Sequence, residues 1–268
     1  MKKMESNKDL TVLLPIHELN NDNELKLLGN ALKSISDQKV LPKEVLIIAP
    51  KKSEVIKVLE GFDFSIYKFK YKIIKNGGDS DFCSQINFGV NNVKTKWFSF
   101  IEFDDEYSNN WLKNVDEYVN SYEDVNVFLP IIVNVDEKGE FIGLSNEPVW
   151  ANGFSDKLGY LDNDILLAYQ NFNFSGFAMT KETFIDNGGL KKSLKLTFIY
   201  EFLLRLTYKD IKIMVLPKIG YKHMNHRVGS LFNTYLSEMN SVESNWWLAQ
   251  AKKEYFFNNE RQITYEIK

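Results

Sequence analysis

The sequence predicts an α/β protein with a mixed, mainly parallel sheet that is flanked by helices. Short, continuous apolar runs such as Leu10–Pro15 and Glu44–Ala49 are typical of strands that are buried on both faces, as in parallel sheets. Segments with apolar residues at helical spacing alternate with these runs along the chain. The length of 268 residues allows one large domain or two small ones, each with a substantial core.

A regular strand–helix alternation runs through the first half of the chain. A helix is predicted over residues 24–37, because Leu25, Leu28 and Ile35 recur at helical spacing between the first two strands. Together these three segments form a βαβ unit. The elements predicted after it are a helix over 53–60, a strand over 67–74, a turn over 76–79, a helix over 81–93 and a strand over 97–103.

The second half of the chain has shorter and less regular elements. They are a strand region over 125–135, a hairpin turn over 136–139, an irregular loop over 143–161, helices over 180–187 and 197–208, a strand over 211–216 that ends before Pro217, and a helical segment over 231–258. No linker rich in Pro, Gly or Ser divides the sequence. We therefore expect one domain over residues 1–225, with residues 226–268 as a helical C-terminal extension packed on it.

The composition is that of a globular protein. Hydrophobic residues make up 44% and charged residues 26%, which excludes a chain that is mainly disordered. The formal net charge of -3 disfavours a generic nucleic-acid-binding protein. However, residues 1–180 carry 19 basic and 27 acidic side chains, whereas residues 181–268 carry 14 and 9. An acidic, metal-binding part followed by an anion-tolerant part gives this division, and so does ordinary variation of surface charge.

Features that bear on cellular location favour the cytoplasm. The single cysteine, Cys83, has no partner for an internal disulfide and is predicted to be a packing residue in a reducing compartment. The first nine residues lack an apolar signal region, and no apolar run approaches the ~18 residues of a membrane-spanning helix. We therefore expect a cytoplasmic protein with no transmembrane segment.

A cluster of carboxylates follows the predicted strand over 97–103. Glu102, Asp104, Asp105 and Glu106 fall within five positions, at the strand end where α/β sheets bind ligands. Like charges this close together are costly unless a cation compensates them, and a divalent metal ion with oxygen ligands is the usual partner. Because side chains alternate along a strand, Glu102 and Asp104 are expected to point the same way and share one metal. The alternative is an exposed acidic turn before a helix that starts near Asn109.

The order of the motifs resembles glycosyltransferase family 2. The matching segments are the opening strand and loop Thr11–Glu18, the helix and second strand over Ala31–Gln38 and Pro42–Ile48, Asn87-x-Gly89, Glu102-Phe-Asp104-Asp105 in place of the Asp-x-Asp signature, Ser175-Gly176, and Phe184–Leu190. The resemblance runs from about residue 10 to residue 230. It implies the GT-A fold of nucleotide-diphospho-sugar transferases, and the transfer of a sugar from a nucleotide-sugar donor.

The resemblance also implies a donor site with a metal ion. Mn²⁺ or Mg²⁺ is expected on Asp104, where it neutralises the donor diphosphate. Related enzymes place a histidine over the metal or the diphosphate after the last strand, so His226 is the preferred second ligand, ahead of His223. Arg227 suits bidentate contact with phosphate. The alternative for this stretch is a surface loop with histidine as a polar residue. The residues expected at the donor are Pro15, Glu18, Asp79, Asn87, Glu102 and Arg227.

One departure from the family concerns recognition of the donor base. The family's second strand usually ends in Asp-Asp-x-Ser, whose acid contacts the nucleobase, whereas Ala49–Ser53 carries no acid. This removes the usual argument for uridine, although a UDP-sugar stays slightly favoured. Glu18 and Asp79 are the remaining candidates for contact with the base or ribose.

A second departure concerns the catalytic base. Inverting transfer needs a carboxylate that takes the proton of the acceptor hydroxyl. The family carries this base in a Glu-Asp pair about six residues before an arginine. Arg205 corresponds to that arginine, but Phe198-Ile199 replaces the pair. Glu201 is therefore the candidate base, with Asp186 a distant second. The alternative is that Glu201 only pairs with Arg205 at i,i+4.

We therefore expect a metal-dependent inverting glycosyltransferase that acts on a glycan or a lipid-linked saccharide. The sequence has neither a Gly-x-x-x-x-Gly-Lys loop nor a Gly-x-Gly-x-x-Gly loop, which disfavours kinase-like and dinucleotide-binding proteins. Two alternatives stay open. One is a catalytically impaired protein that binds nucleotide sugars, since the Glu-Asp pair and the acid at the end of the second strand are both missing. The other is a glycosyltransferase that acts on modified DNA bases, since residues 181–268 are basic, although a nucleic-acid partner is not favoured.

Overall fold

The computed structural model describes residues 6–51, 54–225, 227 and 230–264. Its strands are β1 (Ser6–Pro15), β2 (Leu41–Pro50), β3 (Tyr71–Asn76), β4 (Trp97–Phe100), β5 (Glu106–Tyr107), β6 (Val127–Val135), β7 (Phe141–Ser145), β8 (Tyr160–Leu161), β9 (Ala178–Thr180) and β10 (Ile213–Met224). Its α-helices are α1 (Asp22–Ser36), α2 (Glu54–Gly61), α3 (Phe82–Asn92), α4 (Trp111–Ser121), α5 (Asn163–Ala168), α6 (Lys181–Asp186), α7 (Phe198–Tyr208), α8 (Leu231–Glu238) and α9 (Ser241–Glu254). Two short 3₁₀ helices, η1 (Glu147–Trp150) and η2 (Lys192–Thr197), complete these elements.

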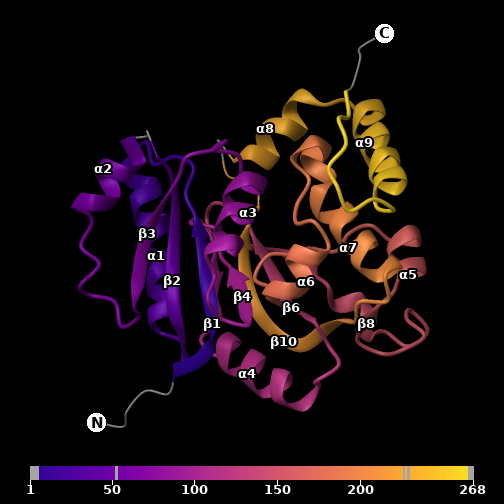
Figure 1. Cartoon of the computed structure of the whole chain (residues 1–268), viewed down its shortest axis with the longest axis horizontal. Coiled ribbons are helices and arrows are strands. Elements are labelled where there is room, and N and C mark those ends of the chain that lie inside the picture. Colours follow the sequence, from indigo (N-terminus) through magenta and orange to yellow (C-terminus); the bar gives the residue numbers. More distant parts are fainter. Residues whose placement is uncertain (1–5, 52–53, 226, 228–229, 265–268) are drawn as a thin grey trace.

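The described strands form one sheet in the order β3-β2-β1-β4-β9-β6-β10-β5, with β7 paired to β6 and β8 paired to β10. Figure 1 labels β3, β2, β1, β4, β6 and β10 in this order across the sheet. Strands β3, β2, β1 and β4 are parallel to one another, and β10 is parallel to β6. The short strand β9 lies antiparallel between β4 and β6 and joins the two parallel groups. The prediction of a mixed, mainly parallel sheet is therefore confirmed.

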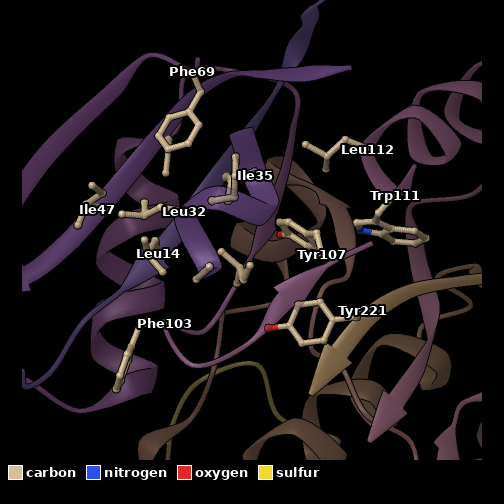
Figure 2. Packing of buried hydrophobic residues seen from close by; sticks show 14 of the residues in the cluster. Leu14, Leu32, Ile35, Ile47, Phe69, Phe103, Tyr107, Trp111, Leu112 and Tyr221 are labelled. Atoms are coloured by element: carbon tan, nitrogen blue, oxygen red, sulfur yellow. The ribbon is translucent and has the colours of Figure 1, made fainter. Parts of the chain in front are cut away.

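Two apolar clusters pack on opposite faces of this sheet. Successive residues of a strand point to opposite faces, and so Leu14 lies in one cluster and Leu13 in the other. Helices α1, α2 and α4 contribute to the first cluster, and α3, α6 and α7 to the second. Figure 2 shows part of the first cluster, in which Leu32 of α1 lies beside Ile47 of β2 and Ile35 lies further along the helix. Burial on both faces explains why the central strands are apolar along their whole length.

Helix α1 begins with a capping arrangement that also positions a carboxylate. The Asn21 side chain accepts a hydrogen bond from the Glu24 backbone N–H, and the Glu24 carboxylate accepts one from the Asn20 backbone N–H at 2.6 Å. The first bond satisfies an N–H group that the helix start leaves unpaired, and the second ties the Glu24 carboxylate to the backbone before the cap. The cap therefore holds Glu24 at the N-terminal end of α1, next to the loop that follows β1.

Strand β4 is shorter than the sequence predicts. It ends at Phe100 instead of Phe103, and the backbone then turns, with the Asp105 N–H bonded to the Glu102 carbonyl at 3.2 Å. Once the extended conformation ends, strict alternation of side chains no longer applies. The expectation that Glu102 and Asp104 share one side of a strand is therefore wrong.

Strand β10 is longer than the sequence predicts. We expected Pro217 to end it, because proline lacks an N–H for the strand ladder. The strand instead continues to Met224, and its register with β6 shifts between Val215 and Tyr221. Irregularities of this kind accommodate proline within a sheet. The continued strand carries Tyr221 and His223 to the same edge of the sheet as the carboxylates.

The C-terminal segment consists of two helices rather than one. Helix α9 packs against α7 and η2, and its Trp247 side chain is buried. The Thr197 hydroxyl donates a hydrogen bond to the Trp247 carbonyl. Packing is thus the role of Trp247 in this structure. No helix in the described ranges is long and apolar enough to cross a membrane.

Candidate functional site

Three side chains converge beyond the end of β4. Glu102, Asp105 and His223 each place one ligand atom within 4.8 Å of the others. The Asp105 carboxylate is buried and accepts two hydrogen bonds, from the Met224 backbone N–H at 2.8 Å and from His223 Nδ1 at 2.9 Å when that nitrogen carries a proton. Asp105 therefore orients the imidazole from the side of Nδ1. We call Glu102, Asp105 and His223 the acidic cluster.

Glu102 is held at both its backbone and its side chain. Its N–H donates to the Tyr221 hydroxyl at 3.1 Å, and its Oε1 accepts from the Ser175 hydroxyl at 3.2 Å. Tyr221 is fully buried and stands edge-on to Tyr107, with ring centroids 5.6 Å apart (Figure 2). A rigid aromatic pair thus supports the residue that begins the cluster.

Crowded negative charge shifts the protonation of the site. Burial, and then the neighbouring Asp105 carboxylate, raise the pKa of Glu102 from 4.5 to about 8. Burial alone would lower the pKa of His223, but Asp105 and Glu102 raise it to about 10. Both shifts mean that the folded site holds its protons tightly, through burial first for Glu102 and through the Asp105 charge for His223.

The residues of the acidic cluster fit a divalent metal ion. Two carboxylates and one imidazole offer the hard oxygen and nitrogen donors that Mn²⁺ accepts, and Mg²⁺ prefers the oxygens. The Asp105–His223 hydrogen bond resembles the arrangement by which carboxylates orient metal-binding histidines. The three donors come from two segments, the turn after β4 and the end of β10.

Asp104 lies in a neighbouring ion-pair group. Its carboxylate accepts a hydrogen bond from Arg227 Nε at 2.6 Å, and Arg227 Nη1 lies 3.5 Å from Glu24. The guanidinium also stacks over the Phe103 ring, at 5.0 Å from its centroid, and Arg227 is 5% exposed. Asp104 as a metal ligand stays a prediction, because the structure gives it a guanidinium partner and groups Asp105 with Glu102 instead. His226 lies outside the described residues.

The loop after β1 borders this ion-pair group. His17 stands edge-on to Phe103, with ring centroids 6.0 Å apart, and burial lowers the pKa of His17. Its Nε2 lies 3.6 Å from the Glu18 carboxylate. The Arg227 charge also lowers the pKa of His17, and the Asp104 charge raises it. Glu18 and Pro15, which ends β1, are therefore near the acidic motif, as a donor site requires, while their contact with the donor stays a prediction.

The structure gives Asn87 a structural role. Its amide donates to the Leu190 carbonyl at 2.8 Å and accepts from the Leu190 N–H at 2.9 Å, which clamps α3 to the segment after α6. Gly189 has a φ of +66°, and a Cβ there would lie 2.6 Å from the Asn87 oxygen. Asp79, the other donor candidate on this side, forms an exposed ion pair with Lys192. Donor contacts of Asn87 and Asp79 stay predictions.

Glu201 lies in a buried ion-pair network. Its two carboxylate oxygens pair with Lys191 Nζ at 2.9 Å and Arg205 Nη2 at 2.8 Å, and its side chain is 0% exposed. The i,i+4 pairing with Arg205 is thus confirmed. A base must touch the acceptor hydroxyl, and a side chain with no exposed surface does not. These contacts argue against Glu201 as the base, and that role stays a prediction.

The start of α7 is apolar where related enzymes carry their acidic pair. Phe198 packs on Phe82, with ring centroids 5.8 Å apart, and Phe82 in turn stands edge-on to Phe100 at the end of β4. Glu201 is the only carboxylate on α7. Asp186, the second candidate base, is exposed at the end of α6.

Sequence reasoning missed the central place of His223 and the supporting roles of Ser175 and Tyr221. A signal was present, because Tyr221 and His223 are two positions apart and point to the same face if the strand continues. The prediction that the strand ends at Pro217 hid this signal. The Ser175-Gly176 match marked Ser175 without giving it a role, because its contact with Glu102 spans 73 positions of sequence.

The sequence matches the model of the family described as Glycosyl transferase family 2 over residues 21–186. No curated protein matches the chain. The crystal structure of S. aureus TarS is similar, with a TM-score of 0.54 and 16% identity over 92% of this chain and 43% of that chain. The structures of TarS 1–349 with UDP and with UDP-GlcNAc have TM-scores of 0.55 and 0.58 at 16% and 15% identity, over 92% of this chain and 72% of theirs. These likenesses confirm the predicted fold, and the chain spans under half of the longer TarS chain.

Proposed function

The chain belongs to glycosyl transferase family 2, and from this we propose that it transfers a sugar from a nucleotide-sugar donor to a hydroxyl of a saccharide acceptor. The observation that carries the proposal is the acidic cluster, which lies beyond the end of a strand in a mainly parallel sheet. Ligands bind at this edge of α/β sheets. A glycan or a lipid-linked saccharide is the acceptor class that we propose.

We further propose that Glu102, Asp105 and His223 hold Mn²⁺ or Mg²⁺. When bound, the ion stabilises the negative charge that develops on the departing nucleoside diphosphate. Asp105 keeps the imidazole oriented, and Arg227 of the neighbouring ion-pair group offers phosphate a guanidinium once its pairing with Asp104 or Glu24 opens. The combination of a cation site and a neighbouring guanidinium supports a diphosphate-containing donor.

A UDP-sugar is the donor that we propose. The TarS structures with UDP and UDP-GlcNAc support this choice through the shared fold. In this chain the end of β2 carries Lys51, whose N–H bonds the Asn76 carbonyl, instead of an acid. We therefore propose that the β1 loop recognises the base, with Glu18 as its acidic candidate.

A second candidate function is nucleotide-sugar binding without transfer. The specific observation behind it is the absence of an accessible carboxylate on α7, where Glu201 is buried in ion pairs and Phe198 packs on Phe82. An inverting mechanism through Glu201 would need those ion pairs to open. A protein that binds the donor and does not transfer its sugar has no such need.

The test combines donor binding with turnover. Purified protein is titrated by calorimetry with a panel of UDP-sugars in Mn²⁺ and in EDTA, and UDP release is measured with saccharide acceptors. Binding with turnover supports the transferase, whereas binding without turnover under every acceptor condition selects the second candidate.

Glu102→Gln should weaken Mn²⁺-dependent binding at least 10-fold, by analogy with the loss of other metal-site contacts. Glu106→Gln, in the same motif but paired with Lys222, is the matched control. No binding of any nucleotide sugar would overturn both candidates.

A further inference from the structure

The loop over residues 173–176 supports Glu102 from two directions. Ser175 donates its hydroxyl to the Glu102 carboxylate at 3.2 Å. Gly176 has a φ of +72° and lies so close to Tyr221 that a Cβ there would be 2.3 Å from the ring. Tyr221 in turn accepts the Glu102 backbone N–H at 3.1 Å. One short loop therefore contacts the Glu102 carboxylate directly and its backbone through Tyr221.

A buried amide fixes this loop. Asn146 is 0% exposed, and its side chain forms two hydrogen bonds with the backbone of Asn173: Nδ2 donates to the carbonyl at 2.8 Å, and Oδ1 accepts from the N–H at 2.9 Å. Nδ2 also donates to the Pro130 carbonyl of β6 at 2.8 Å. The Asn173 side chain then accepts from the Ser175 N–H at 2.8 Å. An unbroken series of hydrogen bonds thus leads from β6 to the Glu102 carboxylate.

The backbone at Asn146 adds a second observation. Asn146 has a φ of +74°, in the left-handed region where residues other than glycine are uncommon. Asparagine tolerates this region better than most residues, but it is less favourable there than glycine. Glycine would suit the backbone and lacks the amide. The amide, which makes all three bonds, is what distinguishes asparagine from glycine at this position.

We propose that Asn146 and Ser175 are positioning residues, which hold the Glu102 carboxylate in the orientation that binds a divalent cation. The inference rests on the proposed function, because it concerns the cation site of that function. Neither residue belongs to the acidic cluster itself. Partners of metal ligands commonly change metal affinity by 10- to 100-fold when they are removed.

The experiment has two parts: the affinity for Mn²⁺ without any nucleotide sugar, and the structure of the metal-free protein. Mn²⁺ affinity is determined by electron paramagnetic resonance for the full chain and for Ser175→Ala and Asn146→Gly. We expect about a 10-fold loss of affinity in each variant. Asn146→Gly relaxes the backbone while removing the amide, so a loss in that variant reports the amide rather than strain. Asn146→Asp, which places a buried carboxylate oxygen against the Pro130 and Asn173 carbonyls in place of the Nδ2 donor, should lose at least as much affinity as Asn146→Gly.

Ser145→Ala is the matched control. Ser145 is 8% exposed and Ser175 is 6% exposed, and the Ser145 hydroxyl accepts a hydrogen bond from Asn134 that lies outside the series leading to Glu102. We expect Ser145→Ala to lose about as much thermal stability as Ser175→Ala and to keep the Mn²⁺ affinity of the unaltered protein. Equal losses of affinity in Ser145→Ala and Ser175→Ala would overturn the proposal, because they would report general destabilisation.

A crystal structure of metal-free Ser175→Ala makes the test independent of the metal. We expect the Glu102 carboxylate to leave the position that it occupies in the metal-free unaltered protein. A carboxylate that stays in place, or an unchanged Mn²⁺ affinity in Ser175→Ala, would overturn the positioning role. If the unaltered protein binds no Mn²⁺, the metal part of the proposed function fails, while the position of Glu102 still decides the role of Ser175.

Discussion

Glu102 and His223 show how burial and neighbouring charge act on single residues. Burial and Asp105 raise the pKa of Glu102 from 4.5 to about 8, and Asp105 raises that of His223 from 6.5 to about 10 against the effect of burial. In both cases the folded state binds the proton more tightly than the unfolded state. Stability linked to these protons is therefore greatest at low pH and is lost as the pH rises through the shifted values.

The first prediction follows from these shifts. The metal-free protein should lose thermal stability as the pH rises from about 5 to about 10, and Mn²⁺ should restore it at the upper end because a cation binds the deprotonated groups. Differential scanning calorimetry in EDTA and in Mn²⁺ measures both effects. Asp105→Asn, which removes the charge that raises the pKa of His223, should flatten the profile above pH 6.5. A metal-free stability that rises over this range would contradict the assignment.

The second prediction concerns Glu201. Glu201→Gln leaves Lys191 and Arg205 buried without their carboxylate, and removing one partner of a buried ion pair costs about 3 to 5 kcal/mol. The free energy of unfolding in urea should fall by that amount. The exposed Glu182→Gln on the neighbouring helix should change it by less than about 0.5 kcal/mol. A variant of unchanged stability that loses turnover would instead restore Glu201 as the base.

At the scale of the elements, hydrogen bonds between α3 and the segment after α6 give a structural role to Asn87, which the family motif suggested as a donor contact. Asn87 of α3 forms two hydrogen bonds with Leu190, which tie the helix to the segment that leads to η2. The third prediction is that Asn87→Ala lowers the free energy of unfolding by about 1 to 3 kcal/mol, since buried backbone groups lose their partners. Calorimetry should find the affinity for UDP unchanged.

Asn92→Ala serves as the control for this variant. Asn92 lies on the same helix and donates an exposed hydrogen bond to Phe88 within one turn. Its loss should affect stability only slightly. A large loss of UDP affinity in Asn87→Ala, with stability intact, would support the donor contact that the resemblance implies.

The local sequence pattern predicted some strand boundaries and not others. The strands Leu10–Pro15 and Glu44–Ala49 were predictable, because burial on both faces leaves an uninterrupted apolar run. The end of β4 and the continuation of β10 were not. Phe103 is apolar and buried like a strand residue, yet it lies in a turn, and Pro217 lies within a strand whose register shifts around it. Both features depend on neighbouring strands.

At the scale of the whole molecule, ion pairs join the acidic and basic parts of the sequence. Cations of residues 181–268 pair with carboxylates of residues 1–180 as Lys192–Asp79, Lys212–Asp124, Lys222–Glu106, Arg227–Asp104 and Arg227–Glu24. The exposed pairs among them contribute little to stability. The buried pairs of Arg227 lie beside the acidic cluster. The uneven charge of the sequence therefore matters mainly at the candidate site, where these pairs form.

The C-terminal helices are bound to the rest of the chain by buried polar contacts. Lys191 donates to the Glu254 carbonyl at 3.0 Å, and Arg205 donates to the Asn258 carbonyl at 3.3 Å. Trp247 is buried against η2. The segment after α8 therefore completes the network around Glu201.

The fourth prediction is that deleting residues 241–268 prevents cooperative folding, because two buried cations lose carbonyl partners and the apolar surface under Trp247 is exposed. Circular dichroism during thermal denaturation and gel filtration test this. Deleting residues 262–268, which keeps these contacts, is the control. A stable, cooperatively melting protein that ends at residue 240 would show that residues 241–268 are a dispensable extension.

The sequence by itself determined the α/β class, the order of most elements and the position of the carboxylate motif, because local periodicity follows from the geometry of helices and strands. Only the tertiary structure decided which charged groups meet. His223 forms a hydrogen bond with Asp105 across 118 positions, Arg227 pairs with Asp104, and Glu201 forms a buried ion pair with Lys191. These pairings depend on the turn after β4, the register of β10 and the packing of α9. Such contacts between distant segments are set by the packed molecule, and no local pattern contains them.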